Sequence, residues 1–175
     1  MTYTAEIESM FMEVNELMNQ GSYTEAKERL SDLLEQEPGY GRAHNHMAWL
    51  YETQLKDSAK AAYHYRLALK FAPDYLPVYL NYIWFLFDQS QMKAHRALIA
   101  EAMTVNGINK PALLNELGRS EEVAGNIRAA AKHYKHAIAK SLNTDEIEVF
   151  KHNIKRVLGK LSLLDRVILW LSANS

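Results

Sequence analysis

The chain of 175 residues contains no cysteine, four prolines and seven glycines. Without cysteine it cannot form a disulfide, a thiolate-ligated zinc site or a cysteine nucleophile. So few prolines and glycines argue against a turn-rich all-β chain, and a hydrophobic content of 48% with abundant Ala, Leu, Glu and Lys favours long helices. A chain of this length buries roughly 70% of its unfolded surface, so its core does not depend on disulfides or a structural metal. The composition therefore predicts an all-α protein.

Long hydrophobic runs are also missing. Residues 1–11, MTYTAEIESMF, carry acidic residues where a secretory signal peptide has a basic segment followed by an apolar one. The apolar stretch LSLLDRVILWL at residues 161–171 contains Asp165 and Arg166 and spans eleven residues. A transmembrane helix needs about 20 apolar residues. We therefore expect no membrane span and a cytoplasmic location.

The net charge is small, −1 at pH 7, which gives no global electrostatic case for a nucleic-acid partner. The charge is nevertheless unevenly distributed along the chain. Residues 1–40 contain nine acidic and two basic side chains, whereas residues 41–175 contain twelve acidic and eighteen basic ones. Ordinary solvated helix faces are the simpler interpretation. The alternative is that the two ends pair head to tail or meet partners of opposite charge.

Turn-forming segments recur at a nearly constant interval. EPGYG at residues 37–41 is followed by APDYL at 72–76 and NGINK at 106–110, at spacings of 35 and 34 residues. Residues at i, i+4 and i+7, which share one face of a helix, precede each turn and recur once more near the end. The four sets are Ala26, Leu30 and Leu33; Ala61, Tyr65 and Ala68; His95, Ile99 and Ala102; and Ala130, Tyr134 and Ala137. Four units therefore share one frame.

This pattern resembles the tetratricopeptide repeat, a helix-turn-helix unit of about 34 residues with the pattern W-x2-L-G-x2-Y, then A-x3-F, then P. The resemblance covers about residues 7–142. Outside the four sets above, it rests on Gly21, Tyr23 and Pro38 in the first unit, Met47, Ala48, Tyr51 and Pro73 in the second, and Leu114, Leu117, Gly118 and Gly125 in the fourth. The third unit diverges, with Ile83 and His95 where small residues are expected and Gly107 in place of proline.

The resemblance implies a right-handed helical solenoid, or α-α superhelix, forming a single domain over residues 1–175. The expected repeats are about 7–40, 41–75, 76–110 (divergent) and 111–143, with capping helices at 144–175. In such a unit a small residue on the first helix, Ala48 or Gly118, faces a small one on the second, Ala61 or Ala130. The two backbones can then approach closely, and stability comes from stacking successive units.

The C-terminal segment has the features of a cap on the array. Thr144 is a candidate N-cap with acidic residues after it. Apolar residues then follow at helical spacing, and a final short helix carries a second apolar stripe. These are Ile147, Phe150, Ile154, Val157 and Leu161, then Leu163, Leu164, Val167, Ile168 and Leu171, with Leu169 and Trp170 off the stripe. We expect the final stripe to pack on the last repeat; the alternatives are a dimer seam or a membrane-surface helix.

Histidines are the only candidate metal ligands that draw attention, and their spacing argues against a site. His44 and His46 are two apart and point about 200° away from each other on a helix, so one metal cannot bind both. The pairs His133/His136 and Glu148/His152 share a helix face but supply two ligands each, fewer than a zinc site needs. No nucleophile elbow, phosphate-binding loop or zinc-protease motif is present. We therefore expect no cofactor, no metal and no enzymatic activity.

The family resemblance implies a concave groove, formed by the first helices of successive units, that holds a segment of a partner protein. One equivalent position carries Asn15, Trp49, Trp84 and Arg119, and the position one turn earlier carries Phe11, Asn45, Leu80 and Asn115. The predicted groove consists of these eight residues with Arg42, His46 and Asn81. Tryptophans in such a place are typical binding hot spots. The alternative is that Trp49 and Trp84 belong to the core between repeats.

The predicted partner is another protein, bound through a hydrophobic peptide or an amphipathic helix. The carboxylate clamp by which some family members hold acidic C-terminal tails is not matched, because only isolated asparagines fit it. Two alternatives remain open: a self-assembling adaptor that forms homo-oligomers through its C-terminal helix, and a small secretion or assembly chaperone. A metal-dependent enzyme is less favoured than either.

Overall fold

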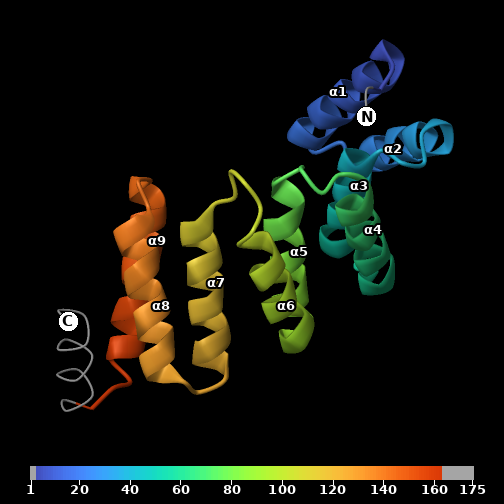
Figure 1. The fold of residues 1–175 in the computed structure, drawn as a ribbon. Coiled ribbons are helices and arrows are strands. Elements are labelled where there is room, and N and C mark those ends of the chain that lie inside the picture. Colours follow the sequence, from blue (N-terminus) through green and yellow to red (C-terminus); the bar gives the residue numbers. More distant parts are fainter. Residues whose placement is uncertain (1–2, 163–175) are drawn as a thin grey trace. The chain divides into compact units, whose positions relative to one another are not determined.

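The computed structural model describes residues 3–162, and this part of the chain is entirely helical, with nine helices and no strand (Figure 1). The all-α prediction is confirmed. None of these helices combines the length and the hydropathy needed to cross a membrane. The predicted final stripe, with Leu163, Leu164, Val167, Ile168 and Leu171, lies outside the described residues, as do Leu169 and Trp170.

The chain divides into two compact units, Met1–Phe85 and Leu86–Ser175. The boundary falls within α5, in the repeat that departs most from the pattern. The expectation of a single domain over residues 1–175 stays a prediction. The helices are α1 (Ala5–Gln20), α2 (Tyr23–Gln36), α3 (Gly41–Thr53), α4 (Ser58–Phe71), α5 (Pro77–Asp88), α6 (Met92–Ala102), α7 (Lys110–Val123), α8 (Ile127–Lys140) and α9 (Thr144–Leu158).

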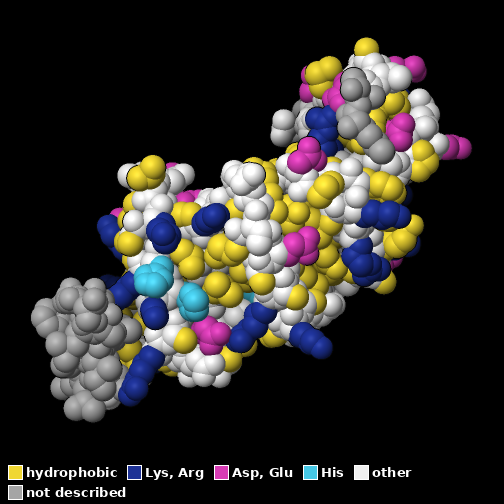
Figure 2. All heavy atoms as spheres, in the orientation of Figure 1, with side chains coloured by type: hydrophobic (Ala, Val, Ile, Leu, Met, Phe, Trp, Pro, Cys, Tyr) yellow, Lys and Arg dark blue, Asp and Glu magenta, His cyan; other side chains and the backbone are white. Residues whose placement is uncertain are grey.

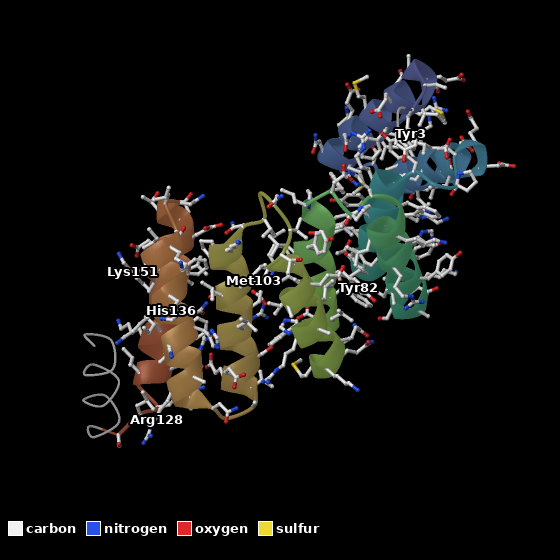
Figure 3. The ribbon with its side chains drawn as sticks, viewed as in Figure 1. Tyr3, Tyr82, Met103, Arg128, His136 and Lys151 are labelled. Atoms are coloured by element: carbon white, nitrogen blue, oxygen red, sulfur yellow. The ribbon has the colours of Figure 1, made fainter. Side chains whose placement is uncertain are left out.

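The i, i+4, i+7 sets face inward on the second helix of every repeat. All twelve residues are at most 1% exposed, which confirms the repeat frame. In the first unit the ring of Tyr65 of α4 stacks on Tyr82 of α5 at 5.2 Å between centroids and meets Phe85 at 5.5 Å. Tyr82 is labelled in Figure 3. Large side chains therefore fill the space between repeats there, while small ones let the helices of each pair approach.

In the second unit the closest approach is between Gly118 of α7 and Tyr134 of α8. A Cβ added at Gly118 would lie 2.5 Å from the ring of Tyr134, which is fully buried. The sequence predicted that Gly118 faces Ala130; the neighbour that leaves no room for a side chain is instead the aromatic ring one turn further along α8. Val157 of α9 and Leu161, which follows that helix, complete a buried cluster with Ala130, Ala131 and Tyr134.

Side-chain caps begin four of the helices. Thr4, Asp57 and Asn109 each accept a hydrogen bond from a backbone N–H in the first turn. Helix α9 begins differently from the prediction. Its cap is Asn143, whose Oδ1 accepts from the N–H groups of Asp145 and Glu146 at 2.9 and 3.1 Å, and Thr144 is the first helical residue. The amide of Asn143 satisfies two of the free donors that every helix start presents.

We predict that Gly118→Ala lowers the free energy of unfolding by about 1–2 kcal/mol, measured by urea denaturation. Alanine favours a helix over glycine by about 1 kcal/mol, but overpacking a filled core costs about 1–3 kcal/mol, and the buried ring has little room to move. Gly159→Ala is the control, because its backbone is helical and its new Cβ meets only backbone oxygens, at 3.3 Å or more. An unchanged or raised stability for Gly118→Ala would contradict the packing described.

Candidate binding groove

A hollow of about 700 Å³ lies in the first unit, where side chains from α1, α2, α3 and α5 converge. We call it the amide groove because four of its eight lining residues are asparagines. The lining consists of Asn15, Met18, Asn19, Tyr23, Asn45, His46, Trp49 and Asn81.

Helical spacing explains why these residues meet. Asn15, Met18 and Asn19 lie at i, i+3 and i+4 of α1 and share one face, and Asn45 and Trp49 are likewise four apart on α3. The adjoining side of α1 carries apolar residues that are buried in the core of the unit. These are Ile7, Met10, Phe11 and Val14. Burial of that side therefore places the asparagines of α1 at the edge of the core, where they line the groove.

Hydrogen bonds hold two of the amides in place. His46 donates from Nε2 to Oδ1 of Asn15 at 2.9 Å, while the Nδ2 of Asn15 donates to the carbonyl of Phe11 at 2.9 Å. Asn81 donates from Nδ2 to Oδ1 of Asn45 at 3.2 Å. Among the described residues no hydrogen bond uses the Nδ2 donor of Asn45 or the Oδ1 acceptor of Asn81. The groove thus presents one donor and one acceptor from neighbouring amides.

Trp49 serves both the core and the groove. Its half-buried ring packs against the core cluster of the first unit and lies 5.6 Å from the ring of Tyr23. The same side chain lines the groove. Trp84 differs, because it is 43% exposed on α5 and is not part of the lining. The two tryptophans that share a position in the repeat frame therefore have different surroundings.

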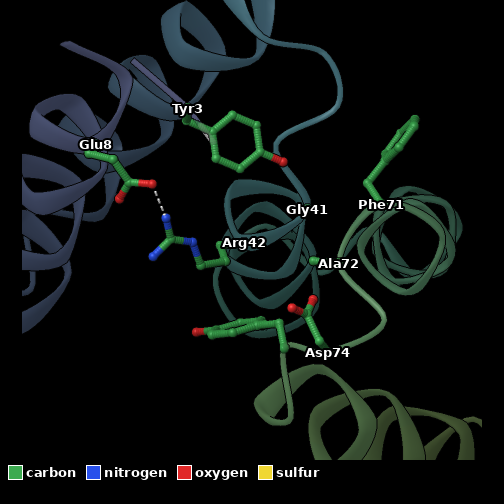
Figure 4. A pocket seen from close by; sticks show the side chains of 8 residues that line it. Tyr3, Glu8, Gly41, Arg42, Phe71, Ala72 and Asp74 are labelled. Atoms are coloured by element: carbon green, nitrogen blue, oxygen red, sulfur yellow. Dashed lines mark hydrogen bonds and ion pairs between the residues drawn. The ribbon is translucent and has the colours of Figure 1, made fainter. Parts of the chain in front are cut away.

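Three other predicted residues of the first unit lie outside the groove lining. Phe11 is 5% exposed and packs on Tyr40, with 5.2 Å between ring centroids. Arg42 pairs with Glu8 and lines a separate hollow of about 400 Å³ (Figure 4). Leu80 is half-buried on α5. Of the nine predicted residues in this unit, the structure brings together Asn15, Asn45, His46, Trp49 and Asn81.

Asn115 and Arg119 belong to the second unit and have partners there. Asn153 of α9 donates to Asn115 at 2.8 Å, and both residues are buried. Arg119 pairs with Glu116 at 2.9 Å and lies 4.0 Å above the ring of Phe87. It also lines a hollow of about 340 Å³. The structure therefore does not add these two residues to the amide groove.

Met18, Asn19 and Tyr23 line the groove but were absent from the predicted set. Asn19 is one turn beyond Asn15 on the same face of α1, so helical periodicity alone could have found it. The sequence placed Tyr23 at the turn of the first repeat and gave it no further role. Only the contact with Trp49 shows that its ring also forms a wall of the groove.

Comparisons with known proteins bear directly on this unit. Residues 11–75 match the family model of the tetratricopeptide repeat. This stretch includes every residue of the amide groove except Asn81. Residues 11–75, about a third of the chain, therefore resemble tetratricopeptide repeats in sequence. No curated protein matches it.

Solved structures extend the likeness in fold to most of the chain. They include PilW, a widely conserved type IV pilus biogenesis factor, with a TM-score of 0.72, 18% identity and coverage of 93% of this chain and 82% of that one. The pilF protein of Pseudomonas aeruginosa has a TM-score of 0.75 and 19% identity, over 88% of this chain and 68% of that one. A thermophilic tetratricopeptide protein of Thermus thermophilus has a TM-score of 0.66 and 15% identity, over 85% of this chain and 81% of that one. Tetratricopeptide folds are typical of protein-interaction modules rather than of enzymes.

His44 and His46, both on α3, form hydrogen bonds with different partners. His44 is 5% exposed and packs beside Phe71 at 5.9 Å, as predicted for a packing residue. Its Nε2 donates to the carbonyl of Pro38 at 3.0 Å, and its Nδ1 lies 2.9 Å from Nδ1 of His64. Among residues 3–162 no three His, Cys, Asp or Glu side chains are grouped to hold a metal ion. That the chain uses no metal stays a prediction.

One cluster in the second unit has the composition of a catalytic triad. Ser120 Oγ lies 2.8 Å from Nδ1 of His95, and Nε2 of His95 lies 3.9 Å from a carboxylate oxygen of Glu116. The three residues are 2%, 0% and 3% exposed. A substrate could not reach such a serine, so the cluster is best described as a buried polar network.

The pair His44–His64 predicts a stability that depends on pH. Burial lowers the pKa of His44, and burial together with the neighbouring His44 lowers the pKa of His64 from 6.5 to about 4. Between about pH 6.5 and 4 the unfolded chain binds protons that the folded chain does not, so the free energy of unfolding falls as the pH drops. His64→Gln should flatten this dependence in urea denaturation. The control His152→Gln, at an exposed position, should leave the slope unchanged, and an unchanged slope for His64→Gln would contradict the account.

Proposed function

We propose that this tetratricopeptide protein is a non-enzymatic interaction module that holds a segment of a partner protein in the amide groove. The observation that carries the proposal is the unused donor of Asn45 beside the unused acceptor of Asn81, next to a wall formed by Tyr23 and Trp49. A peptide unit offers one C=O and one N–H, which fits one donor and one acceptor.

An extended segment suits this arrangement better than an amphipathic helix does. Within a helix the backbone N–H and C=O groups are already paired, so a bound helix would leave the two amides without partners. An extended chain exposes both groups and places alternate side chains on opposite sides. The favoured ligand is therefore an extended peptide with an apolar side chain against Trp49 and Met18.

None of the eight groove residues carries a charge at neutral pH. Burial lowers the pKa of His46, which keeps its ring neutral there. Affinity would then come from hydrogen bonds and aromatic contact and would vary little with salt, because charge pairs are the interactions that salt screens.

A role in assembling other proteins is a finer form of the same proposal. PilW, whose structure is similar over 93% of this chain, is described as a pilus biogenesis factor. The partner would then be a component of a protein assembly, and the groove would hold one of its extended segments.

Trp49→Ala should weaken the binding of peptides selected from a random library against the full chain by about 30-fold, since a central aromatic is worth about 2 kcal/mol. Asn81→Ala should weaken it by about tenfold, because the peptide N–H loses its acceptor. Both affinities can be measured by isothermal titration calorimetry after circular dichroism has shown that the variants are folded.

Trp84→Ala is the matched control, because it removes the same side chain from an exposed position outside the groove lining. Its affinity should stay within about twofold of the wild type, a difference well below 1 kcal/mol. Peptides that lose affinity with Trp84→Ala and keep it with Trp49→Ala would place the binding site elsewhere and refute the proposal.

A further inference from the structure

The outward face of α8 is basic. Lys132, His136 and Lys140 follow one another at i+4 spacing, and Lys135 and His133 flank them. The helix contains no acidic residue, and its other side is buried. No ion pair joins Lys132, Lys135 or Lys140 to an acid among the described residues. Figure 2 shows histidine and basic side chains gathered over this part of the second unit.

The outward face of α2 in the first unit is acidic. Glu25, Glu28, Asp32 and Glu35 lie at spacings of three, four and three residues, and all four are exposed. Of the two basic residues on this helix, Arg29 bonds to Glu13 of α1 at 2.7 Å. Asp32 lies 3.9 Å from Arg29, while the three glutamates have no ion pair among the described residues.

The two faces match in position, length and charge. Both helices are the second of their repeat and have 14 residues, and in both the i, i+4, i+7 set is buried on the opposite side. At a rise of about 1.5 Å per residue, the acidic row is about 15 Å long and the basic row about 12 Å long. Residues 1–85 contain 12 acidic and 7 basic side chains, whereas residues 86–175 contain 9 acidic and 13 basic side chains.

We propose that α8 of one molecule docks on α2 of a second copy of this chain. The argument is charge complementarity between two unpartnered helix faces that lie on different units of the same chain. Because the two faces differ, the contact is heterologous, and each added copy leaves one face free at either end. The result is a reversible head-to-tail oligomer. The groove plays no part in it, so this proposal stands or falls separately from the function above.

Sedimentation velocity of the full chain at increasing concentration tests the proposal. The sedimentation coefficient should rise with concentration at about 20 mM salt and return to the monomer value at about 500 mM, where screening is strong. The variant Lys132→Glu/Lys140→Glu, with a reversed α8 face, and the variant Glu28→Lys/Glu35→Lys, with a reversed α2 face, should each be monomeric. An equal mixture of the two should associate again, since each acidic face then meets a basic one.

The control Lys93→Glu/Lys110→Glu changes the net charge as Lys132→Glu/Lys140→Glu does, at exposed positions on α6 and α7, and should associate as the wild type does. Circular dichroism checks that each variant is folded. The proposal is wrong if the wild type stays monomeric at low salt or if association survives high salt. It is equally wrong if the control also loses association, or if the mixture of reversed variants stays monomeric.

Discussion

Burial of one narrow face on the second helix of each repeat is the constraint on which the other features depend. The sets that begin at Ala26, Ala61, His95 and Ala130 are nearly inaccessible to solvent. Once these faces point inward, the opposite faces must point outward, so α2 and α8 present their charges. Most second helices pack against their pair through small residues, and the approach of Gly118 to the Tyr134 ring leaves no space for even a methyl group. The positions of the exposed side chains therefore follow from the core.

The same constraint produces the amide groove. With Ile7, Met10 and Val14 buried, α1 turns its asparagines toward α3, where Asn45, His46 and Trp49 meet them. The donor of Asn45 and the acceptor of Asn81 have no hydrogen-bond partner among the described residues, so both are open to a ligand or to water. A groove with neutral amides and an aromatic wall recognises backbone and apolar surface rather than charge.

Much of the fold followed from the sequence because it depends on periodicity. The i, i+4, i+7 sets, the turns and the family resemblance predicted the repeats. The groove was predicted in part, since equivalent repeat positions identify residues that share a helix face but not what covers that face. Phe11 lies under Tyr40, Arg42 is taken by Glu8, and Trp84 lies outside the lining. Asn115 has a buried partner in Asn153 that lies 38 residues away in sequence, which no local pattern reveals.

The central claim is that the amide groove is the surface by which this protein binds its partner. Photocrosslinking in the native host tests it most directly, with a photoreactive amino acid in place of exposed Asn19 at the groove and, for comparison, in place of exposed Lys93 on α6. The account predicts that Asn19 yields a discrete crosslinked protein and that Trp49→Ala in the same chain removes it. A crosslink that persists with Trp49→Ala, or that forms from Lys93 and not from Asn19, would contradict the account.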